Sequence, residues 1–273
     1  KSNWCILESD ESDGSFIKIP PTYSIVTNID AEHMDFYRSI ENLKNNFVKF
    51  INKTPSFGKS FICLDNQNNK DILKKISNMN YLTYGTDKKS NFRILNVVQK
   101  INYSMFDIKI SLPSNKKKYI KNIKVPIIGL HNIRNVTAAI AVSFSIGIPN
   151  KLIKDGLKNF QGVQRRFTKI FSFQKVPFFD DYAHHPTEIK EVLNGVKEVY
   201  KNKEIVCIFQ PHRISRLKNL RKDFSKAFIK ADTVVLCPIY KAGENINLGF
   251  KYSKFANELI KNSKIKVILI KDK

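Results

Sequence analysis

The 273-residue sequence predicts an α/β protein made of two domains that follow one another along the chain. Short runs of β-branched and aromatic residues alternate with amphipathic helical windows through most of the chain, which is typical of layered α/β folds. Between residues 92 and 128 strand-like segments follow one another without a helix, and the regular alternation resumes after residue 160. We therefore divide the chain into residues 1–130 and a second, Rossmann-like domain of residues 131–273.

In the first domain the hydrophobic pattern predicts strands at residues 4–8, 24–28 and 60–65 and helices at residues 41–51 and 71–77. The alternation of strands and helices then stops. Three further strands are predicted at residues 93–98, 106–112 and 123–128, and we interpret them as an antiparallel appendage because no helix separates them.

The second domain is expected to begin with helices at residues 132–145 and 151–160. Gly147, Pro149 and Asn150 lie between them and are suited to end one helix and cap the next. Alternating elements follow: strands at residues 168–173, 178–181, 205–209, 233–236 and 265–270, and helices at residues 187–200, 217–229 and 253–262.

The composition argues against several classes of protein. The net charge is +23, but only 8 of the 47 basic residues are arginines, the lysines are spread along the chain, and the longest basic run, which begins at Lys116, follows a predicted turn. This distribution argues against nucleic-acid binding, which stays open as an alternative, and favours a general attraction for anionic substrates.

No apolar stretch reaches the roughly 20 residues of a membrane span, and no export signal is visible, so we expect a cytoplasmic protein without a membrane partner.

Acidic residues and a histidine follow two predicted strands of the first domain. Glu8 begins a run of four acids within residues 7–13, and His33 lies among acids within residues 27–35. Carboxylates at the carboxyl ends of strands lie where α/β proteins bind ligands, and their oxygens suit Mg²⁺. The alternatives are a solvated acidic turn and a surface histidine. Two such clusters together favour a metal and phosphate site.

Two short motifs near the domain boundary are suited to a nucleotide. Asn132 and Asn135 lie on one face of a predicted helix and could address a base or sugar, although Asn132 could instead cap the helix. Arg165 and Arg166 precede a predicted strand, and their planar guanidinium groups suit phosphate contacts.

A tyrosine, two acids and two histidines are crowded into residues 180–188, at a predicted strand-to-helix junction. Asp181, Tyr182 and His184 are the candidate functional residues here, and Thr187 is the expected helix cap. Folding alone does not explain this density of polar side chains.

The next predicted strand ends in a second such segment, which contains His212, Arg213 and Arg216. Half of the arginines of the chain lie here and in the earlier arginine pair, although lysine is the usual cation elsewhere. We infer that the fork geometry of the guanidinium group is needed at these positions.

Taken together, the motifs L-E-x-D-E-S-D, T-N-I-D-A-E-H-M-D, G-x-H-N-x-x-N-x-x-A-A, G-V-x-R-R-F, D-D-Y-x-H-H-P-T-E and F-Q-P-H-R-x-S-R resemble the Mur ligase family. Their order and spacing are most similar to those of the members that join L-alanine to UDP-N-acetylmuramate. The resemblance implies part of the central ATPase domain followed by an incomplete Rossmann-like C-terminal domain.

The phosphate-binding loop of the family is not found in the sequence. The segment Gly58-Lys59-Ser60 does not form one, because Lys53 stands where the first glycine is required and a strand rather than a helix is predicted to follow. We therefore expect the 273 residues to be inactive by themselves.

The resemblance implies a ligase of peptidoglycan precursor synthesis that uses ATP and Mg²⁺. ATP phosphorylates the lactyl carboxylate of UDP-N-acetylmuramate, and the amine of L-alanine attacks the acyl phosphate. By position, Glu8 and His33 would bind or adjoin Mg²⁺. The nucleotide contacts would be Asn132 and Asn135 to adenine, Arg166 to phosphate or ribose, and Asp181 to the ribose hydroxyls.

The resemblance also implies a pocket for L-alanine and the lactyl group, lined by Tyr182, His184, His212, Arg213 and Arg216. All but the tyrosine are expected to be catalytic, and an arginine is expected to pair with the alanine carboxylate. The ligase that recycles cell-wall tripeptide is the alternative member of the family.

Overall fold

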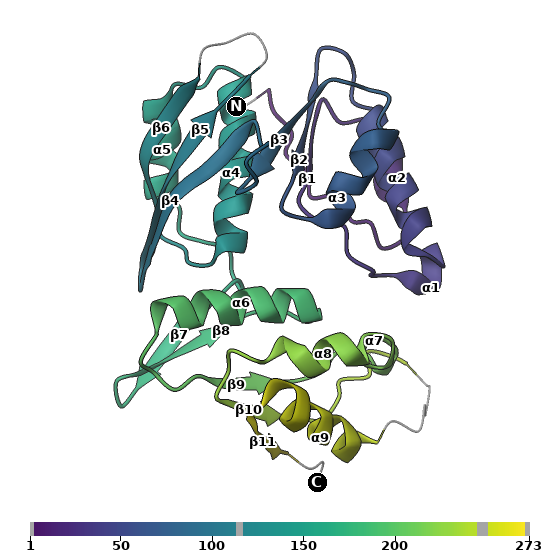
Figure 1. The fold of residues 1–273 in the computed structure, drawn as a ribbon, viewed down its shortest axis with the longest axis vertical. Helices are drawn as coiled ribbons and strands as arrows, with labels where there is room; N and C mark the ends of the chain where they lie inside the picture. Colours follow the sequence, from purple (N-terminus) through teal and green to yellow (C-terminus); the bar gives the residue numbers. More distant parts are fainter. Residues whose placement is uncertain (1–2, 113–116, 245–250, 271–273) are drawn as a thin grey trace. The chain divides into compact units, whose positions relative to one another are not determined.

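The computed structural model of the chain describes residues 3–112, 117–244 and 251–270 (Figure 1). It divides into two compact units. The first comprises Lys1–Val98, Met105–Lys124 and Ile133–Lys158, and the second comprises Gln99–Ser104, Val125–Asn132 and Asn159–Lys273. Residues 133–158 thus lie with the first unit, whereas the sequence analysis ended the first domain at residue 130. Lys116 lies outside the described residues.

A six-stranded sheet of order β1-β2-β3-β4-β5-β6 organises the first unit. Its strands are β1 (Tyr23–Val26), β2 (Lys59–Cys63), β3 (Tyr81–Gly85), β4 (Phe92–Lys100), β5 (Tyr103–Ile110) and β6 (Lys118–Val125). The first four pair in parallel. Only two residues join β4 to β5, a connection that permits only antiparallel pairing.

This sheet changes two expectations. The three consecutive strands are confirmed, but they are not a separate appendage, because Tyr84 and Gly85 of β3 pair with Phe92 and Arg93 of β4. Strand β3 was not predicted.

The strand predicted at residues 4–8 is wrong. These residues belong to no strand, and the Ile6 side chain is 96% exposed. An apolar run needs a neighbouring strand to satisfy its backbone, and none of the described strands pairs with this one.

Polar side chains cap two of the helices of the first unit. The helices are α1 (Met34–Tyr37), α2 (Ile40–Asn52), α3 (Gln67–Ile72), α4 (Leu130–Ser145) and α5 (Asn150–Lys158), with 3₁₀ turns at Ser15–Lys18 and Leu73–Lys75. Ser39 caps α2, and Asn66 caps α3 by accepting a hydrogen bond from the backbone N–H of Asn69 at 3.0 Å. Because of that cap, α3 begins four residues earlier than predicted.

The second unit contains two separate sheets (Figure 1). Strands β9 (Val206–Phe209), β10 (Thr233–Leu236) and β11 (Lys266–Leu269) form a parallel sheet of order β11-β10-β9. Strands β7 (Thr168–Phe173) and β8 (Val176–Asp180) form an antiparallel hairpin of their own. Gln174 and Lys175 both have positive φ, 46° and 66°, as a two-residue type I′ turn requires. The Rossmann-like alternation therefore begins only at β9.

Four helices accompany these strands: α6 (Pro186–Val199), α7 (Ile214–Asn219), α8 (Arg221–Ala227) and α9 (Tyr252–Ser263). The single helix predicted at residues 217–229 is two short helices that meet at Leu220. Side chains of α6, α8 and α9 pack on one face of the parallel sheet around Phe209, Phe224 and Phe255. Among the described residues, no helix is both long and apolar enough to cross a membrane.

Candidate functional site

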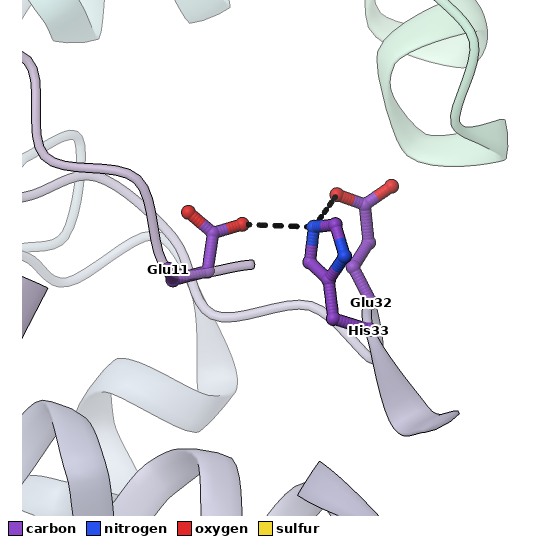
Figure 2. Close-up of side chains that lie close together, drawn as sticks. All are labelled: Glu11, Glu32 and His33. Carbon is purple, nitrogen blue, oxygen red and sulfur yellow. Dashed lines mark ion pairs between the residues drawn. The ribbon is translucent and has the colours of Figure 1, made fainter. Parts of the chain in front are cut away.

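Three side chains of the first unit point toward a common centre (Figure 2). The Nε2 atom of His33 lies 3.6 Å from Oε1 of Glu11 and 3.9 Å from Oε2 of Glu32. One ligand atom from each residue lies within 4.8 Å of the others, and all three residues are half-buried. We call Glu11, Glu32 and His33 the carboxylate–histidine cluster.

Local backbone geometry builds this cluster. His33 precedes α1 in the left-handed region, with φ of 55°, a conformation that costs a non-glycine residue about 1–3 kcal/mol and is concentrated at functional sites. On the other side, residues 11–14 form a turn in which the N–H of Gly14 donates to the Glu11 carbonyl at 3.1 Å. Asp10 and Asp13 accept hydrogen bonds from Ser12 and Ser15, so their carboxylates hold the turn together.

Tyr37 connects the two sides. Its hydroxyl donates to the Glu11 carbonyl, and its backbone N–H donates to the His33 carbonyl at 2.9 Å. Burial, followed by the nearby Glu11 carboxylate, raises the pKa of Tyr37 to about 12, so the phenol keeps its proton at neutral pH.

The donor set fits a divalent cation. Two carboxylates supply the hard oxygen ligands that Mg²⁺ prefers, while the imidazole nitrogen also suits Mn²⁺. Glu8, which the sequence analysis placed at the metal, is exposed and does not belong to the cluster. The acidic run was identified from its sequence, but Glu11, three residues after Glu8, was not singled out. Glu32, which directly precedes His33, was not singled out either.

Asn132 and Asn135 lie in the first turns of α4, as predicted. The Asn132 side chain donates to the Ile128 carbonyl at 2.8 Å, and Asn135 is exposed. Between them, Arg134 donates through Nε to Asp65 at 2.6 Å.

The Asp65 carboxylate, only 7% exposed, also accepts hydrogen bonds from the backbone N–H groups of Thr86 and Asp87 at 2.8–3.1 Å. This carboxylate therefore joins the start of α4 to the end of β3. No sequence pattern indicated its role.

In the second unit, Asp181 shapes the loop between β8 and α6. Its two carboxylate oxygens accept hydrogen bonds from the backbone N–H groups of Phe167 at 2.7 Å and Ala183 at 2.8 Å. Burial raises its pKa above the ordinary aspartate value, although both hydrogen bonds act in the opposite direction. Asp181 thus holds the loop that carries Tyr182 and His184.

Helix α6 begins with a capping box formed by His185 and Glu188. The His185 side chain accepts a hydrogen bond from Thr187, and Oε2 of Glu188 accepts from the backbone N–H of His184 at 3.0 Å and of His185 at 3.2 Å. The predicted cap at Thr187 is wrong, since the cap is His185. Burial acts to raise the pKa of Glu188, but these bonds and the nearby cations hold it below the ordinary value.

Tyr182 and His184 lie beside the loop that follows β9. The ring centroids of His184 and His212 are 6.1 Å apart, and those of His184 and Tyr182 are 5.2 Å apart. Nη1 of Arg216 lies 3.3 Å from Nδ1 of His212. Burial, together with Arg216 and other nearby cations, lowers the pKa of His212. Four predicted residues, Tyr182, His184, His212 and Arg216, are therefore neighbours, and we call them the His–Arg cluster.

Arg213 stands apart from this cluster. Its side chain is exposed, its φ is 68°, and its backbone N–H donates to the Tyr240 carbonyl at 2.9 Å. Glu244, missed in the sequence analysis, accepts hydrogen bonds from the N–H groups of Ile214 and Ser215 at the start of α7.

The adjacent arginines contact different partners. Arg165 lies over the Tyr182 ring, 4.5 Å from its centroid, and Nη1 of Arg166 lies 3.4 Å from Glu188. The Arg165 side chain is 62% exposed and the Arg166 side chain is 49% exposed, so each guanidinium group is accessible to a ligand.

Comparison with known proteins identifies the architecture. Residues 2–143 match the Mur ligase middle domain, and residues 165–273 match the domain described as "Mur ligase, glutamate ligase domain". The UDP-N-acetylmuramate–L-alanine ligase of Pelagibacter ubique is 64% identical over the whole chain, which spans 59% of the length of that relative.

Solved structures agree. The UDP-N-acetylmuramate–alanine ligase of Thermotoga maritima matches with a TM-score of 0.72 and 26% identity, over 96% of this chain and 54% of that one. A murein peptide ligase from Psychrobacter arcticus matches with a TM-score of 0.59 over 94% of this chain and 51% of that one, and at 20% identity this shows likeness of fold alone. With residues 2–143 and 165–273 matched in chain order to two domains of one family, the chain belongs to the Mur ligases.

Proposed function

We propose that the chain is the central and C-terminal part of an ATP-dependent ligase that joins L-alanine to the lactyl carboxylate of UDP-N-acetylmuramate. The observation that carries this proposal is the 64% identity, over the whole chain, to a ligase of that name. Because the chain spans 59% of that relative, the activity is proposed for the whole protein. We also propose a cytoplasmic location, since the reaction consumes ATP.

Glu11 and His33, with Glu32 beside them, would hold the Mg²⁺ ion of this reaction. When bound, the ion neutralises charge on the phosphoryl groups. This assignment replaces Glu8 by Glu11, and it is supported by the half-buried cluster with its two carboxylates and one imidazole.

The His–Arg cluster would hold L-alanine. The planar guanidinium group of Arg216 binds a carboxylate with better defined geometry than a lysine ammonium group would. Two parallel hydrogen bonds fix the orientation of the carboxylate. Arg213, exposed next to this cluster in sequence, is the second candidate for that contact.

Hydrogen bonds support different proposed roles for the two histidines. Nδ1 of His184 faces the Tyr182 carbonyl at 3.0 Å, which can only accept, so Nδ1 carries the proton and Nε2 is left as a base. Nδ1 of His212 faces the Arg216 guanidinium, which can only donate, so the proton of neutral His212 is on Nε2. We assign His184 to remove a proton from the alanine ammonium, and His212 to donate to a carboxylate or phosphoryl oxygen.

The ATP contacts rest on the family resemblance. Asn132 and Asn135 are assigned to adenine and Arg166 to the phosphates or ribose. Asp181 already accepts two backbone hydrogen bonds, so its contact with the ribose hydroxyls uses its remaining lone pairs.

Phosphate release by the full-length protein tests the proposal. ATP and UDP-N-acetylmuramate should support turnover with L-alanine and not with tripeptide. The reverse preference would favour the tripeptide-recycling ligase. Turnover with neither, together with salt-sensitive retention on DNA, would favour a nucleic-acid-binding protein.

Substitution of Arg216 tests the amino-acid pocket. Arg216→Lys keeps the charge but loses the two-point contact, so the KM for alanine should rise roughly ten- to a hundredfold while the KM for ATP stays constant. Lys218→Ala removes an exposed cation on the same helix and serves as the control. Equal changes in both constants would instead place Arg216 at the nucleotide or in the fold.

A further inference from the structure

We propose that Tyr37 is a positioning residue that sets the separation of the Glu11 carboxylate and the His33 imidazole, and thereby the affinity of the carboxylate–histidine cluster for its metal ion. This inference rests on the proposed function, which assigns Mg²⁺ to that cluster. The Tyr37 hydroxyl donates to the Glu11 carbonyl, so Tyr37 acts on the cluster through a backbone group.

Tyr37 contacts both metal-binding residues through their backbones. Its hydroxyl donates to the carbonyl of Glu11, and its N–H donates to the carbonyl of His33 at 2.9 Å. Glu11 and His33 are 22 positions apart in the sequence, and the Tyr37 side chain bridges the two segments that carry them.

The tyrosine is itself immobilised. Its side chain is 3% exposed and packs in the core of the first unit with Leu43 and Ile51. Its carbonyl accepts a hydrogen bond from the Asn42 side chain at 3.0 Å, which ties it to α2. Because the ring is held in the core, its hydroxyl is suited to keep the turn of residues 11–14 in a fixed position.

The turn that contains Glu11 fits closely against this support. Gly14 has φ of 71°, and a Cβ atom there would lie 3.0 Å from the Phe36 ring and 3.7 Å from the Tyr37 hydroxyl. The Glu11 carbonyl receives two donors, Gly14 from within the turn and Tyr37 from outside it. The tyrosine bond joins the backbone of the turn to α1, in addition to the packing of Gly14 against Phe36.

Loss of the hydroxyl should therefore leave the turn formed and still packed against Phe36, but its backbone less tightly positioned. The partners that orient metal ligands typically change affinity by 10- to 100-fold when they are removed. We expect the lower end of that range, about tenfold, because Tyr37 orients the backbone of Glu11 rather than its carboxylate.

Binding of Mn²⁺ to the 273-residue chain, followed by the electron paramagnetic resonance signal of the free ion, measures this effect without turnover. Mn²⁺ accepts the same oxygen and imidazole ligands as those assigned to Mg²⁺. Tyr37→Phe should raise the Kd about tenfold while the circular dichroism spectrum stays unchanged.

Tyr252→Phe is the matched control. It also removes a hydroxyl that donates to a backbone carbonyl, that of Cys237, but it lies in the second unit. It should leave the Mn²⁺ affinity unchanged. Should Tyr37→Phe fail to fold, Asn42→Ala removes the hydrogen bond that holds the Tyr37 carbonyl to α2. This variant should weaken Mn²⁺ binding severalfold.

Glu11→Gln separates failure of this inference from failure of the proposed function. A Kd within twofold of the wild-type value for Tyr37→Phe, when Glu11→Gln abolishes binding, would overturn the role of Tyr37 alone. Equal weakening by Tyr252→Phe would do the same. No binding by the wild-type chain, or unaltered binding by Glu11→Gln, would overturn the metal assignment and the role of Tyr37 together.

Discussion

Glu188 offers a sharp test of how the loop carrying His184 is held. Its Oε2 atom accepts the backbone N–H groups of both His184 and His185, while its other oxygen lies 3.4 Å from Arg166. Glu188→Ala removes an acceptor from two N–H groups and should cost about 2–3 kcal/mol, the sum of a lost cap and a partly exposed charged hydrogen bond.

Glu188→Gln should cost much less. A glutamine Oε1 can take the place of the single oxygen that accepts both backbone bonds, so only the attraction to the neighbouring cations is lost. Such half-exposed pairs contribute about 0.5–1 kcal/mol. The structure therefore predicts a large difference between Ala and Gln at this position, whereas an ion pair alone would make them equal.

Urea unfolding and hydrogen exchange of the peptide that covers α6 measure both costs. Thr187→Ala is the control: because His185 is the cap, it should change the unfolding free energy by less than about 0.5 kcal/mol. The pKa of Glu188 is lowered in the folded state, so its contribution is complete above the unfolded glutamate value and is lost as the pH falls through the folded value. Equal losses in Glu188→Ala and Glu188→Gln, or a larger loss in Thr187→Ala, would refute this account.

Three more predictions concern single side chains. Glu8→Gln should leave Mn²⁺ binding unchanged whereas Glu11→Gln removes it, and isothermal titration would contradict the cluster if the two were reversed. Asp65→Ala leaves two backbone N–H groups and a guanidinium without their shared acceptor, so it should lower the unfolding free energy by about 3–5 kcal/mol in urea titrations, and a loss under 1 kcal/mol would count against the role of Asp65. In nuclear magnetic resonance titrations the pKa of His212 should lie below the ordinary histidine value and rise in Arg216→Gln; a fall would contradict the assigned effect of Arg216.

The sequence predicted most elements of the fold because the spacing of their apolar residues matches the face that is buried. The amphipathic helix α2 and the apolar strand β10 are examples, since each carries its own local signal. Residues 4–8 failed because strand formation depends on a partner that the local pattern does not contain. The start of α7 at Ile214, rather than at residue 217, was missed for a similar reason: its first N–H groups bind Glu244, which is distant in sequence.

The sequence located the segments that form the candidate sites, but not which side chains within them face one another. Charge and residue type located the acidic turn and the loops after β8 and β9. Which carboxylate of that turn faces His33 depends on the turn at Gly14 and on the hydroxyl of Tyr37, and neither leaves a periodic signal. His185 was likewise not recognised as a cap because Ser, Thr, Asp and Asn are the usual residues there.

The strand order of the six-stranded sheet bears on how the first unit is made. Every strand lies beside the one that precedes it in the chain, from β1 to β6. Each new strand can therefore add to a finished edge as it leaves the ribosome, and no earlier gap has to be kept open for a later strand. Pairing of strands that follow one another in the chain keeps contact order lower than a crossed-over strand order would. We expect each new strand to cover the edge of the strand before it during synthesis, which shortens the time for which that edge is open to aggregation.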